Sequence, residues 1–349
     1  MLRQLARLTR PFPVAGAGAF AVAVYADAND VPIVARESGM EGVACVDDAA
    51  RLLDVLCDVW ERTRLPSIER WARGLLGFVL WMQEDDGRWI NFVYDWDGAR
   101  NRDGLTSITG ENFWHARALL GVSHAWLAFG DERAEAALRL GLDHAVAKGA
   151  PADVRALHLQ MAGRLVREAG RTDLLPAIRN WADEIASCRI DGVLMNAPAE
   201  RGVPHLWAHI QEGVLADAGE LLADRGLVEV ASASANALLL PAVHSGFEGP
   251  TATPYDVSSA VLSLDRLGVA TGDDAWSALA ADARAWFGGR NAAGQPVYDT
   301  DRGRVGDGID DGCVSGNSGA EANIECAAAL LDVAADVAAR MSAEHLIPE

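Results

Sequence analysis

Lysine is almost absent from this chain of 349 residues, and Lys148 is the only one. Arginine supplies the rest of the positive charge, and 50 acidic residues against 30 basic ones leave a formal net charge of −20. Proteins that bind nucleic acid or anionic membranes use clustered lysine and arginine to reach phosphate groups. The charge balance therefore predicts that nucleic acid and membranes are not partners of this chain.

Cysteine is also scarce. The five cysteines are scattered, odd in number and free of Cys-x-x-Cys spacing, which favours buried thiols in a reducing compartment. The apolar run from Val14 to Val24 is too short to span a bilayer and is interrupted by Gly16 and Gly18. We therefore interpret this run as part of the fold and expect a cytoplasmic protein.

Linkers are missing as well, because no Pro/Ser-rich stretch or charge run divides the chain. We expect a single domain over residues 1–349, with residues 1–46 as an irregular N-terminal segment packed on it. From Asp47 onward, apolar residues recur at helical spacing and predict about eleven helices joined by alternating short and long connections. Short connections make antiparallel helical hairpins, and six hairpins closed in a ring would give an all-α fold.

Three long irregular stretches, residues 84–110, 191–205 and 289–318, interrupt the helical pattern. Long loops in a compact domain are usually functional, so we expect them to form a working face at one end of the hairpins. The last predicted helix runs from Gly319 to about Met341. An open helical solenoid is the alternative, but no repeat of about 34–40 residues is present.

Acidic residues stand where two of these loops run into helices. Asp47 and Asp48 begin the first strongly periodic helix, and Glu321 follows Ser318 and Gly319 at the start of the last one. The helix dipole favours the ionised form of a carboxylate at this position, which suits a general base. Two adjacent carboxylates also raise each other's pKa.

Three short segments resemble a known class of proteins. Glu41–Arg51 is similar to a Gly…Asp-Asp-x-Ala-Arg segment of bacterial toroid proteins found with carbohydrate enzymes. Trp286–Gly294 is similar to the Gly-Arg-Asn-Pro segment of toroid cellulases, although Ala292 stands where those enzymes have proline, and Asn317–Glu321 is similar to their late glutamate loop. The chain thus resembles the (α/α)6 toroids of the six-hairpin glycosidase class.

This resemblance implies an activity and site residues. In the toroid cellulases an early aspartate pair positions the attacking water and a late glutamate is the acid, which would correspond here to Asp47 or Asp48 and to Glu321. We therefore expect a glycoside hydrolase that acts on an oligosaccharide by inversion, in which two carboxyl groups lie roughly 6.5–9.5 Å apart.

Each of these carboxylates also has a structural alternative. One of the two aspartates could simply cap the helix. Ser318 and Glu321 have the spacing of a capping box, which would tie Glu321 to its own helix. Glu325, one turn further, could then be the acid, and Glu111 at the start of another predicted helix is a further catalytic candidate.

Aromatic and polar residues on the predicted loop face are candidates for substrate binding, because aromatic rings stack on the apolar faces of sugars. These candidates are Trp89, Asp95, Trp96, Trp114, His115, Trp207, His209, Arg290, Asn291 and Tyr298. His205 and His209 have the i, i+4 spacing of metal ligands, but no third ligand is apparent in the sequence. We expect no metal and no cofactor, and the oligomeric state is left open.

Two other functions remain open at this stage. A sugar epimerase or isomerase on the same scaffold would rely on histidine bases, for which His205, His209 and His244 are candidates. A carbohydrate-binding protein that works beside a glycosyltransferase would bind glycans without turnover. The sugar and its linkage are not determined by the sequence.

Overall fold

The computed structural model describes residues 1–34, 38–110, 112–147 and 149–348. The chain divides into two compact units, which are described separately. Unit 1 comprises Met1–Lys148, Tyr298–Asp307 and Ser315–Glu349, and unit 2 comprises Gly149–Val297 and Gly308–Val314. The single domain expected over residues 1–349 stays a prediction.

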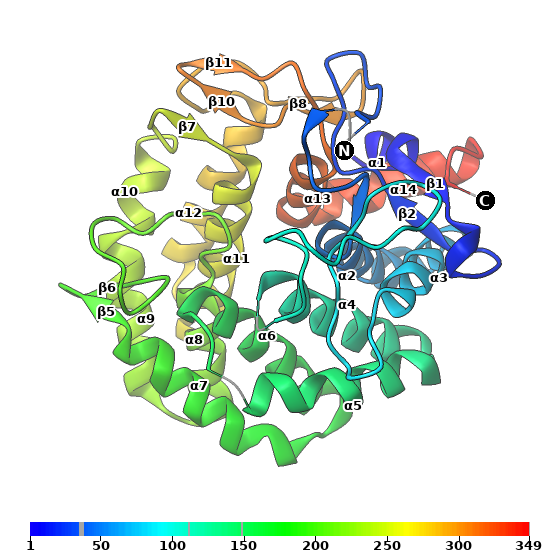
Figure 1. Cartoon of the computed structure of the whole chain (residues 1–349). Helices are drawn as coiled ribbons and strands as arrows, with labels where there is room; N and C mark the ends of the chain where they lie inside the picture. The colour runs from blue at the N-terminus through cyan, green and yellow to red at the C-terminus, as the bar shows by residue number, and fades with distance from the viewer. Residues whose placement is uncertain (35–37, 111, 148, 349) are drawn as a thin grey trace. The chain divides into compact units, whose positions relative to one another are not determined.

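Unit 1 draws its elements from both ends of the chain (Figure 1). They are α1 (Leu2–Leu8), β1 (Thr9–Pro11), η1 (Pro13–Ala15), β2 (Phe20–Val22), β3 (Ala44–Cys45), α2 (Val46–Thr63), α3 (Pro66–Trp81), β4 (Phe92–Val93), α4 (Phe113–Phe129), α5 (Glu132–Ala147), β8 (Tyr298–Asp299), β9 (Arg304–Val305), α13 (Ala320–Ala329) and α14 (Leu331–Ala343). Where it is described, the irregular segment expected over residues 1–46 thus contains the short helix α1, the 3-10 helix η1 and three short strands. Helix α1 packs against α13 and α14, so the two ends of the sequence share one core.

Short links join the helices of unit 1 into packed pairs, as the sequence predicted. Arg64 ends α2 in the left-handed conformation, and Pro66 begins α3 at its first position, where its missing amide hydrogen costs nothing. Gly130 ends α4 in the same left-handed conformation before α5. Helix α2 is central because it packs against α3, α4, α13 and α14.

The last helix differs from the prediction of one continuous helix from Gly319 to about Met341. The structure breaks it at Leu330, whose backbone (φ −113°, ψ 48°) is not helical, so that α13 and α14 are separate. This single-residue break allows α13 and α14 to contact each other as well as α1 and α2. No proline or glycine marks the position in the sequence.

Unit 2 is also built mainly from helices. Its elements are α6 (Ala152–Ala169), η3 (Thr172–Leu174), α7 (Leu175–Ser187), β5 (Arg189–Ile190), β6 (Val193–Leu194), α8 (Gln211–Leu221), α9 (Arg225–Ala237), α10 (Leu239–His244), β7 (Thr251–Ala252), α11 (Pro254–Thr271), α12 (Asp274–Arg284), η4 (Ala285–Gly288), β10 (Ile309–Asp310) and β11 (Cys313–Val314). Helices α6 and α7, α8 and α9, and α11 and α12 pack as pairs. By length and composition alone, Arg225–His244 could cross a membrane, and 39% of its apolar window is buried here.

Candidate functional site

The start of α2 is held by residues outside the aspartate pair. Cys45 occupies the N-cap position, and its Sγ accepts a hydrogen bond from the backbone amide of Asp48 at 3.3 Å. The backbone amide of Asp47 donates to the Asn91 side chain at 3.0 Å, and pairing of β3 with β4 brings Asn91 to this position. Neither aspartate caps the helix, so both side chains are available for other contacts.

The start of α13 shows that the predicted capping box is wrong. Gly319 is the N-cap residue, and no side chain caps it. Its backbone amide donates to Asp307 Oδ1 at 2.6 Å, and Ser318 Oγ accepts a hydrogen bond from Asn323 Nδ2 at 3.0 Å. The Glu321 side chain is 51% exposed and reaches away from its own helix to Arg51.

One guanidinium group gathers carboxyl groups from both helices. Arg51 Nη2 donates to Asp48 Oδ1 at 2.6 Å and to Glu321 Oε2 at 2.9 Å, and Nη1 donates to Glu325 Oε1 at 2.6 Å. Asp47 Oδ2 lies 3.7 Å from Nη2. We call Asp47, Asp48, Glu321 and Glu325 the carboxylate cluster; all four belong to unit 1.

A second arginine, Arg117, binds the carboxylate cluster. Arg117 of α4 is 4% exposed in its side chain and forms a hydrogen-bonded ion pair with Asp47 Oδ1. The sequence analysis assigned no role to Arg51 or Arg117. The spacing of Arg51, three and four residues after the aspartates, was a usable signal, because residues at this spacing lie on one face of a helix. Nothing in the sequence linked Arg117 to Asp47.

The spacing within the cluster differs from the inverting geometry. Asp48 Oδ1 and Glu321 Oε2 both accept a hydrogen bond from the same nitrogen of Arg51. These two oxygens are therefore at most about 5.5 Å apart. Inverting glycosidases hold their carboxyl groups roughly 6.5–9.5 Å apart, and retaining ones roughly 5–5.5 Å. This upper limit applies to one oxygen of each carboxyl group and lies below the inverting range.

The two aspartates have opposite electrostatic states. Burial raises the pKa of Asp48 to about 7, because the opposing attraction of Arg51 is offset by repulsion from Asp47 and Glu321. Burial also acts to raise the pKa of Asp47, but the combined charges of Arg117 and Arg51 outweigh it and hold that pKa below the usual range. Asp47 is therefore ionised at neutral pH, whereas Asp48 exchanges its proton near pH 7.

Burial and the charges of the cluster together raise the pKa values of Tyr25 and Asp307. Burial raises the pKa of Tyr25 to about 12, with Cys45, Asp48 and Glu321 adding to the shift. Burial raises the pKa of Asp307 too, and Glu321 contributes to this increase. Tyr25 and Asp307, which the sequence analysis did not select, thus lie within the electrostatic range of the cluster.

The raised pKa of Asp48 predicts a specific pH dependence of stability. An unfolded aspartate has a pKa of about 3.9, so between about pH 4 and pH 7 the unfolded chain has lost a proton that folded Asp48 keeps. The free energy of unfolding should fall over this range through Asp48, and Asp48→Asn should remove that contribution. Urea unfolding at several pH values, compared between the two proteins, tests this. An unchanged slope in the variant would contradict the assigned pKa.

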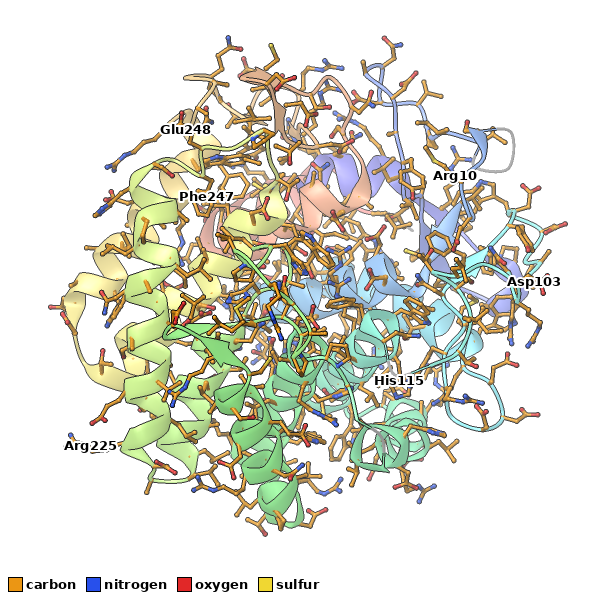
Figure 2. All side chains as sticks on the ribbon, turned by 60° about the vertical axis from the view of Figure 1, so that its left-hand side comes forward. Arg10, Asp103, His115, Arg225, Phe247 and Glu248 are labelled. Atoms are coloured by element: carbon orange, nitrogen blue, oxygen red, sulfur yellow. The ribbon has the colours of Figure 1, made fainter. Side chains whose placement is uncertain are left out.

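Several predicted substrate contacts are buried in unit 1. Trp89 is 0% exposed, and its Nε1 donates to the Val79 carbonyl at 2.9 Å. His115 is also 0% exposed, hydrogen-bonds to the Gly141 carbonyl at 3.1 Å, and has a pKa that burial lowers to about 4 (Figure 2). Trp114 is half-buried and donates to the Trp89 carbonyl. The prediction that Trp89 and His115 lie on an open face is therefore wrong.

The remaining candidates of unit 1 are more accessible. Asp95 and Trp96 are half-buried, and the Arg10 guanidinium lies 5.1 Å from the Trp96 ring centroid. Tyr298 is half-buried, and burial raises its pKa. Glu111 lies outside the described residues.

In unit 2, an aromatic platform and a buried histidine lie close in sequence. Trp207 is 40% exposed, and its ring stacks on His205 at a centroid distance of 3.8 Å. His209 is 0% exposed, so it does not face solvent as predicted for a substrate contact. Its Nδ1 lies 2.7 Å from Asn196 Oδ1, and its Nε2 lies 3.0 Å from Glu212 Oε1.

The hydrogen-bond network fixes the protons around His209. Asn196 Nδ2 donates to the His205 carbonyl and Gln211 Nε2 donates to Asn196 Oδ1, so that oxygen is an acceptor. His209 Nδ1 therefore donates to Asn196 Oδ1, and the other ring nitrogen, Nε2, faces Glu212 Oε1. His209 is thus committed to this network and does not pair with His205 as a metal ligand.

Arg290 and Asn291 have structural partners in unit 2. Arg290 forms an exposed ion pair with Asp282. Asn291 Nδ2 donates to the carbonyls of Trp286 (2.7 Å) and Gln295 (2.9 Å), which shapes the turn after η4. Asn291 therefore stabilises its loop, and the structure shows no feature that assigns it to a substrate.

Within the described residues, one group has ligand atoms spaced for a metal ion. Side-chain atoms of Asp54, Asp58 and His124 all lie within 4.8 Å of one another. Within this group, His124 Nδ1 is hydrogen-bonded to Asp54 Oδ1 at 2.7 Å.

The chain was compared with known proteins. No protein-family model and no curated protein matches it. Among solved structures, a sugar epimerase from a ruminal bacterium is similar over 97% of this chain and 95% of its own, with a TM-score of 0.74 and 11% identity. The cellobiose 2-epimerase from Spirochaeta thermophila is similar over 96% and 94%, with a TM-score of 0.71 and 11% identity.

A hydrolase is similar at a lower score. The GH76 α-mannanase BT2949 from Bacteroides thetaiotaomicron covers 86% of this chain and 89% of its own, with a TM-score of 0.58 and 12% identity. These structures are (α/α)6 toroids. The chain therefore has an all-α (α/α)6 toroid fold, which confirms the fold class expected from the sequence.

Proposed function

We propose that this chain is a carbohydrate-active enzyme that hydrolyses a glycosidic bond, with Asp48 as the proton donor. The observation that carries the proposal is the opposite pKa shift of two adjacent aspartates beside a third, solvent-reaching carboxylate. Paired carboxyl groups whose environments separate their pKa values are typical of acid/base catalysis. A pKa near 7 is also suited to a general acid at neutral pH.

The roles follow from position and exposure. Asp48 supplies the proton to the leaving oxygen, and Glu321 is the carboxylate that attacks the sugar carbon or stabilises its developing charge. Their separation of at most about 5.5 Å supports a retaining reaction rather than the inverting one expected from the resemblance. Asp48 is 2% exposed, so the Arg51–Glu321 ion pair opens to admit the substrate.

A neutral oligosaccharide suits the charge of this site. Four carboxyl groups meet two guanidinium groups, so the cluster keeps an excess of negative charge even when Asp48 is protonated. An anionic substrate would be repelled, whereas sugar hydroxyls donate hydrogen bonds to carboxylates. Half-buried Trp96 of the same unit remains our candidate for stacking on a sugar ring.

A sugar epimerase or isomerase is the second candidate. It is favoured by the higher TM-scores of the sugar epimerase and cellobiose 2-epimerase over that of the mannanase. His205, stacked on exposed Trp207 with its Nε2 3.8 Å from Asp153 Oδ2, would be the accessible base. Glu212 Oε2 is buried beside His209. It has no hydrogen-bond partner among the described residues and could accept a hydrogen bond from a ligand in unit 2.

One experiment separates the two candidates. The protein is incubated with a panel of neutral oligosaccharides in deuterated water, and NMR follows released reducing ends, their first-formed anomer and deuterium at ring carbons. We expect cleavage that retains the anomeric configuration, without deuterium at carbon. Carbon-bound deuterium without cleavage would support the epimerase and overturn the hydrolase. Inversion would retain the hydrolase but exclude Glu321 as the nucleophile.

A further inference from the structure

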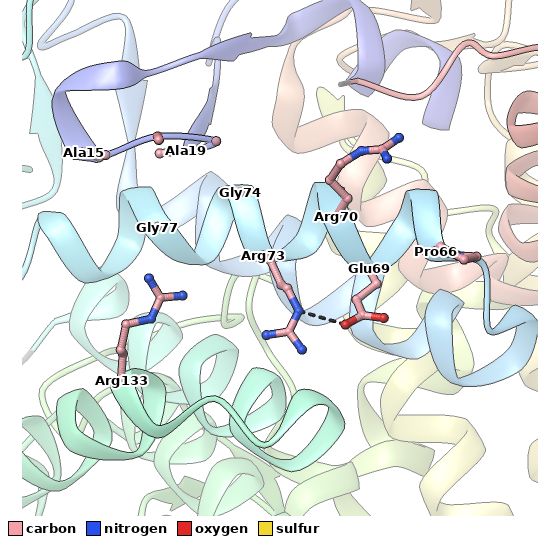
Figure 3. Close-up of a pocket in the computed structure, with 12 residues that line it drawn as sticks. Ala15, Ala19, Pro66, Glu69, Arg70, Arg73, Gly74, Gly77 and Arg133 are labelled. Carbon is pink, nitrogen blue, oxygen red and sulfur yellow. Dashed lines mark hydrogen bonds and ion pairs between the residues drawn. The ribbon is translucent and has the colours of Figure 1, made fainter.

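A pocket of about 530 Å³ lies in unit 1, away from the residues of the carboxylate cluster (Figure 3). It is lined by the loop Ala15–Ala19, by residues on one face of α3, and by Arg133 near the start of α5. Its volume is within the range of small-molecule sites, roughly 300–1,000 Å³. No lining residue belongs to the cluster proposed for catalysis.

Small residues bring the loop against α3. A Cβ on Gly74 would lie 2.1 Å from Phe20 Cδ2 and 2.9 Å from the Gly18 carbonyl oxygen, so a side chain there would displace the loop. A Cβ on Gly77 would lie 3.2 Å from Ala19 Cβ. Backbone rather than side chains therefore forms much of the wall between the loop and the helix.

The loop itself offers hydrogen-bond donors. Gly18 has a φ of +77°, a conformation that favours glycine. Within the described residues, the backbone amides of Ala17 and Gly18 donate no hydrogen bond to the protein. Glycine-rich loops with free amides are typical of anion sites, because the N–H groups approach oxygen atoms without obstruction.

Three arginines and Glu69 line the pocket, and Asp131 beside it forms ion pairs with Arg73 and Arg133. Arg73 and Arg133 extend from α3 and α5 into the space between these helices, while Arg70 extends from the other side of α3 (Figure 3). The arginines thus outnumber the neighbouring carboxylates, Glu69 and Asp131, in a chain whose net charge is −20. The pocket therefore favours an anionic ligand, whereas the carboxylate cluster disfavours one.

Arg73 and Arg133 are held in place by hydrogen bonds that do not use all of their donors. Arg73 Nε donates to Glu69 at 2.8 Å, whereas its Nη bonds to Asp131 and the Phe129 carbonyl are long, at 3.5 and 3.4 Å. Arg133 uses Nε and Nη2 to bind Asp131. Its side chain is 66% exposed, and its Nη1 has no partner among the described residues. Both side chains are held at the pocket with donor capacity left.

We propose that this pocket binds a small molecule through its phosphate group. The Nη1 of Arg133, free among the described residues, and the weakly bound Nη groups of Arg73 can donate charge-assisted hydrogen bonds to phosphate oxygens, and amides of the glycine-bearing loop add neutral donors. The arginines favour an anion here, whereas the carboxylate cluster favours a neutral oligosaccharide. The site is thus separate from the catalytic proposal and is occupied by a different chemical class.

The test uses glucose 6-phosphate and inorganic phosphate as probes, with glucose as the uncharged control. Isothermal titration at constant ionic strength, set with sodium chloride, measures binding to the full chain. We expect both phosphate probes to bind and glucose not to. Loss of one charge-assisted contact in Arg133→Gln should weaken binding about tenfold, and charge reversal in Arg133→Glu should weaken it further.

Arg171→Gln is the matched control. Arg171 is an exposed arginine that binds Asp173, two residues away, much as Arg133 binds Asp131, but it lies in unit 2 and not in the pocket. This variant should bind the phosphate probes like the unchanged protein. The proposal is overturned if neither probe binds at millimolar concentration, or if Arg133→Glu and Arg171→Gln bind equally well.

Discussion

Asp48→Asn is expected to lower the turnover of an unactivated oligosaccharide about 10²–10⁴-fold, which is the usual contribution of a general acid. Asparagine has nearly the same shape but carries no proton that it can transfer to the leaving oxygen. Steady-state kinetics on a cleaved glycan measures the effect. In the unchanged enzyme, activity should also fall as pH rises through about 7, because Asp48 then loses its proton.

The choice of leaving group distinguishes the loss of a proton donor from a general disturbance of the active site. Aryl glycosides with acidic phenols leave without help, so Asp48→Asn should be impaired far less on them than on the oligosaccharide. Asp332→Asn is a suitable control, because that side chain is 96% exposed on α14 and belongs to no cluster. Equal losses on both substrate types would contradict the assigned role of Asp48.

Arg51→Met is expected to destabilise unit 1 by about 3–5 kcal/mol at neutral pH, the usual cost of breaking a buried ion pair by removing one partner. Methionine fills much of the space but leaves Asp48 and Glu325 without the guanidinium that they share. Both carboxyl groups are largely buried, so water cannot replace the lost bonds at low cost. Chemical unfolding at pH 7 measures the difference.

The destabilisation should depend on pH in a defined direction. Without Arg51 the folded-state pKa of each buried carboxyl group rises, so the deficit is largest near pH 7 and shrinks as protonation removes the charges toward pH 4. Arg62→Met, on the exposed side of the same helix, breaks an ion pair with Asp332 and should cost less than about 1 kcal/mol. If both variants lost a similar free energy of unfolding, the ion pairs of Arg51 would not be what stabilises unit 1.

The helical hairpins could be predicted from sequence because their stop and start signals are local. Gly130 and Gly272 end helices in the left-handed conformation, and Pro66 begins one at its first position. Such signals depend on backbone preferences that hold in most surroundings. The break at Leu330 carries no such signal, because packing of α13 and α14 against other helices sets it.

The candidate site was predicted only in part, since its defining contacts are non-local. The sequence analysis selected Asp47, Asp48 and Glu321, and the structure brings these three together in unit 1. It missed Arg51 as their common partner. The structural alternative, in which Glu321 only caps its helix, is wrong, because no side chain caps α13 and Asp307 accepts the hydrogen bond of the Gly319 amide. Trp89 was misplaced because tryptophan in a loop is equally compatible with stacking on a ligand and with burial.

The discontinuous make-up of unit 1 has a consequence for biosynthesis. Arg51 and Glu321 are 270 residues apart, and all of unit 2 lies between them in the sequence. During synthesis the aspartates of α2 are therefore made long before α13. The contacts of Arg51 with Glu321 and Glu325 cannot form until α13 has been made, whereas every residue of unit 2 precedes α13.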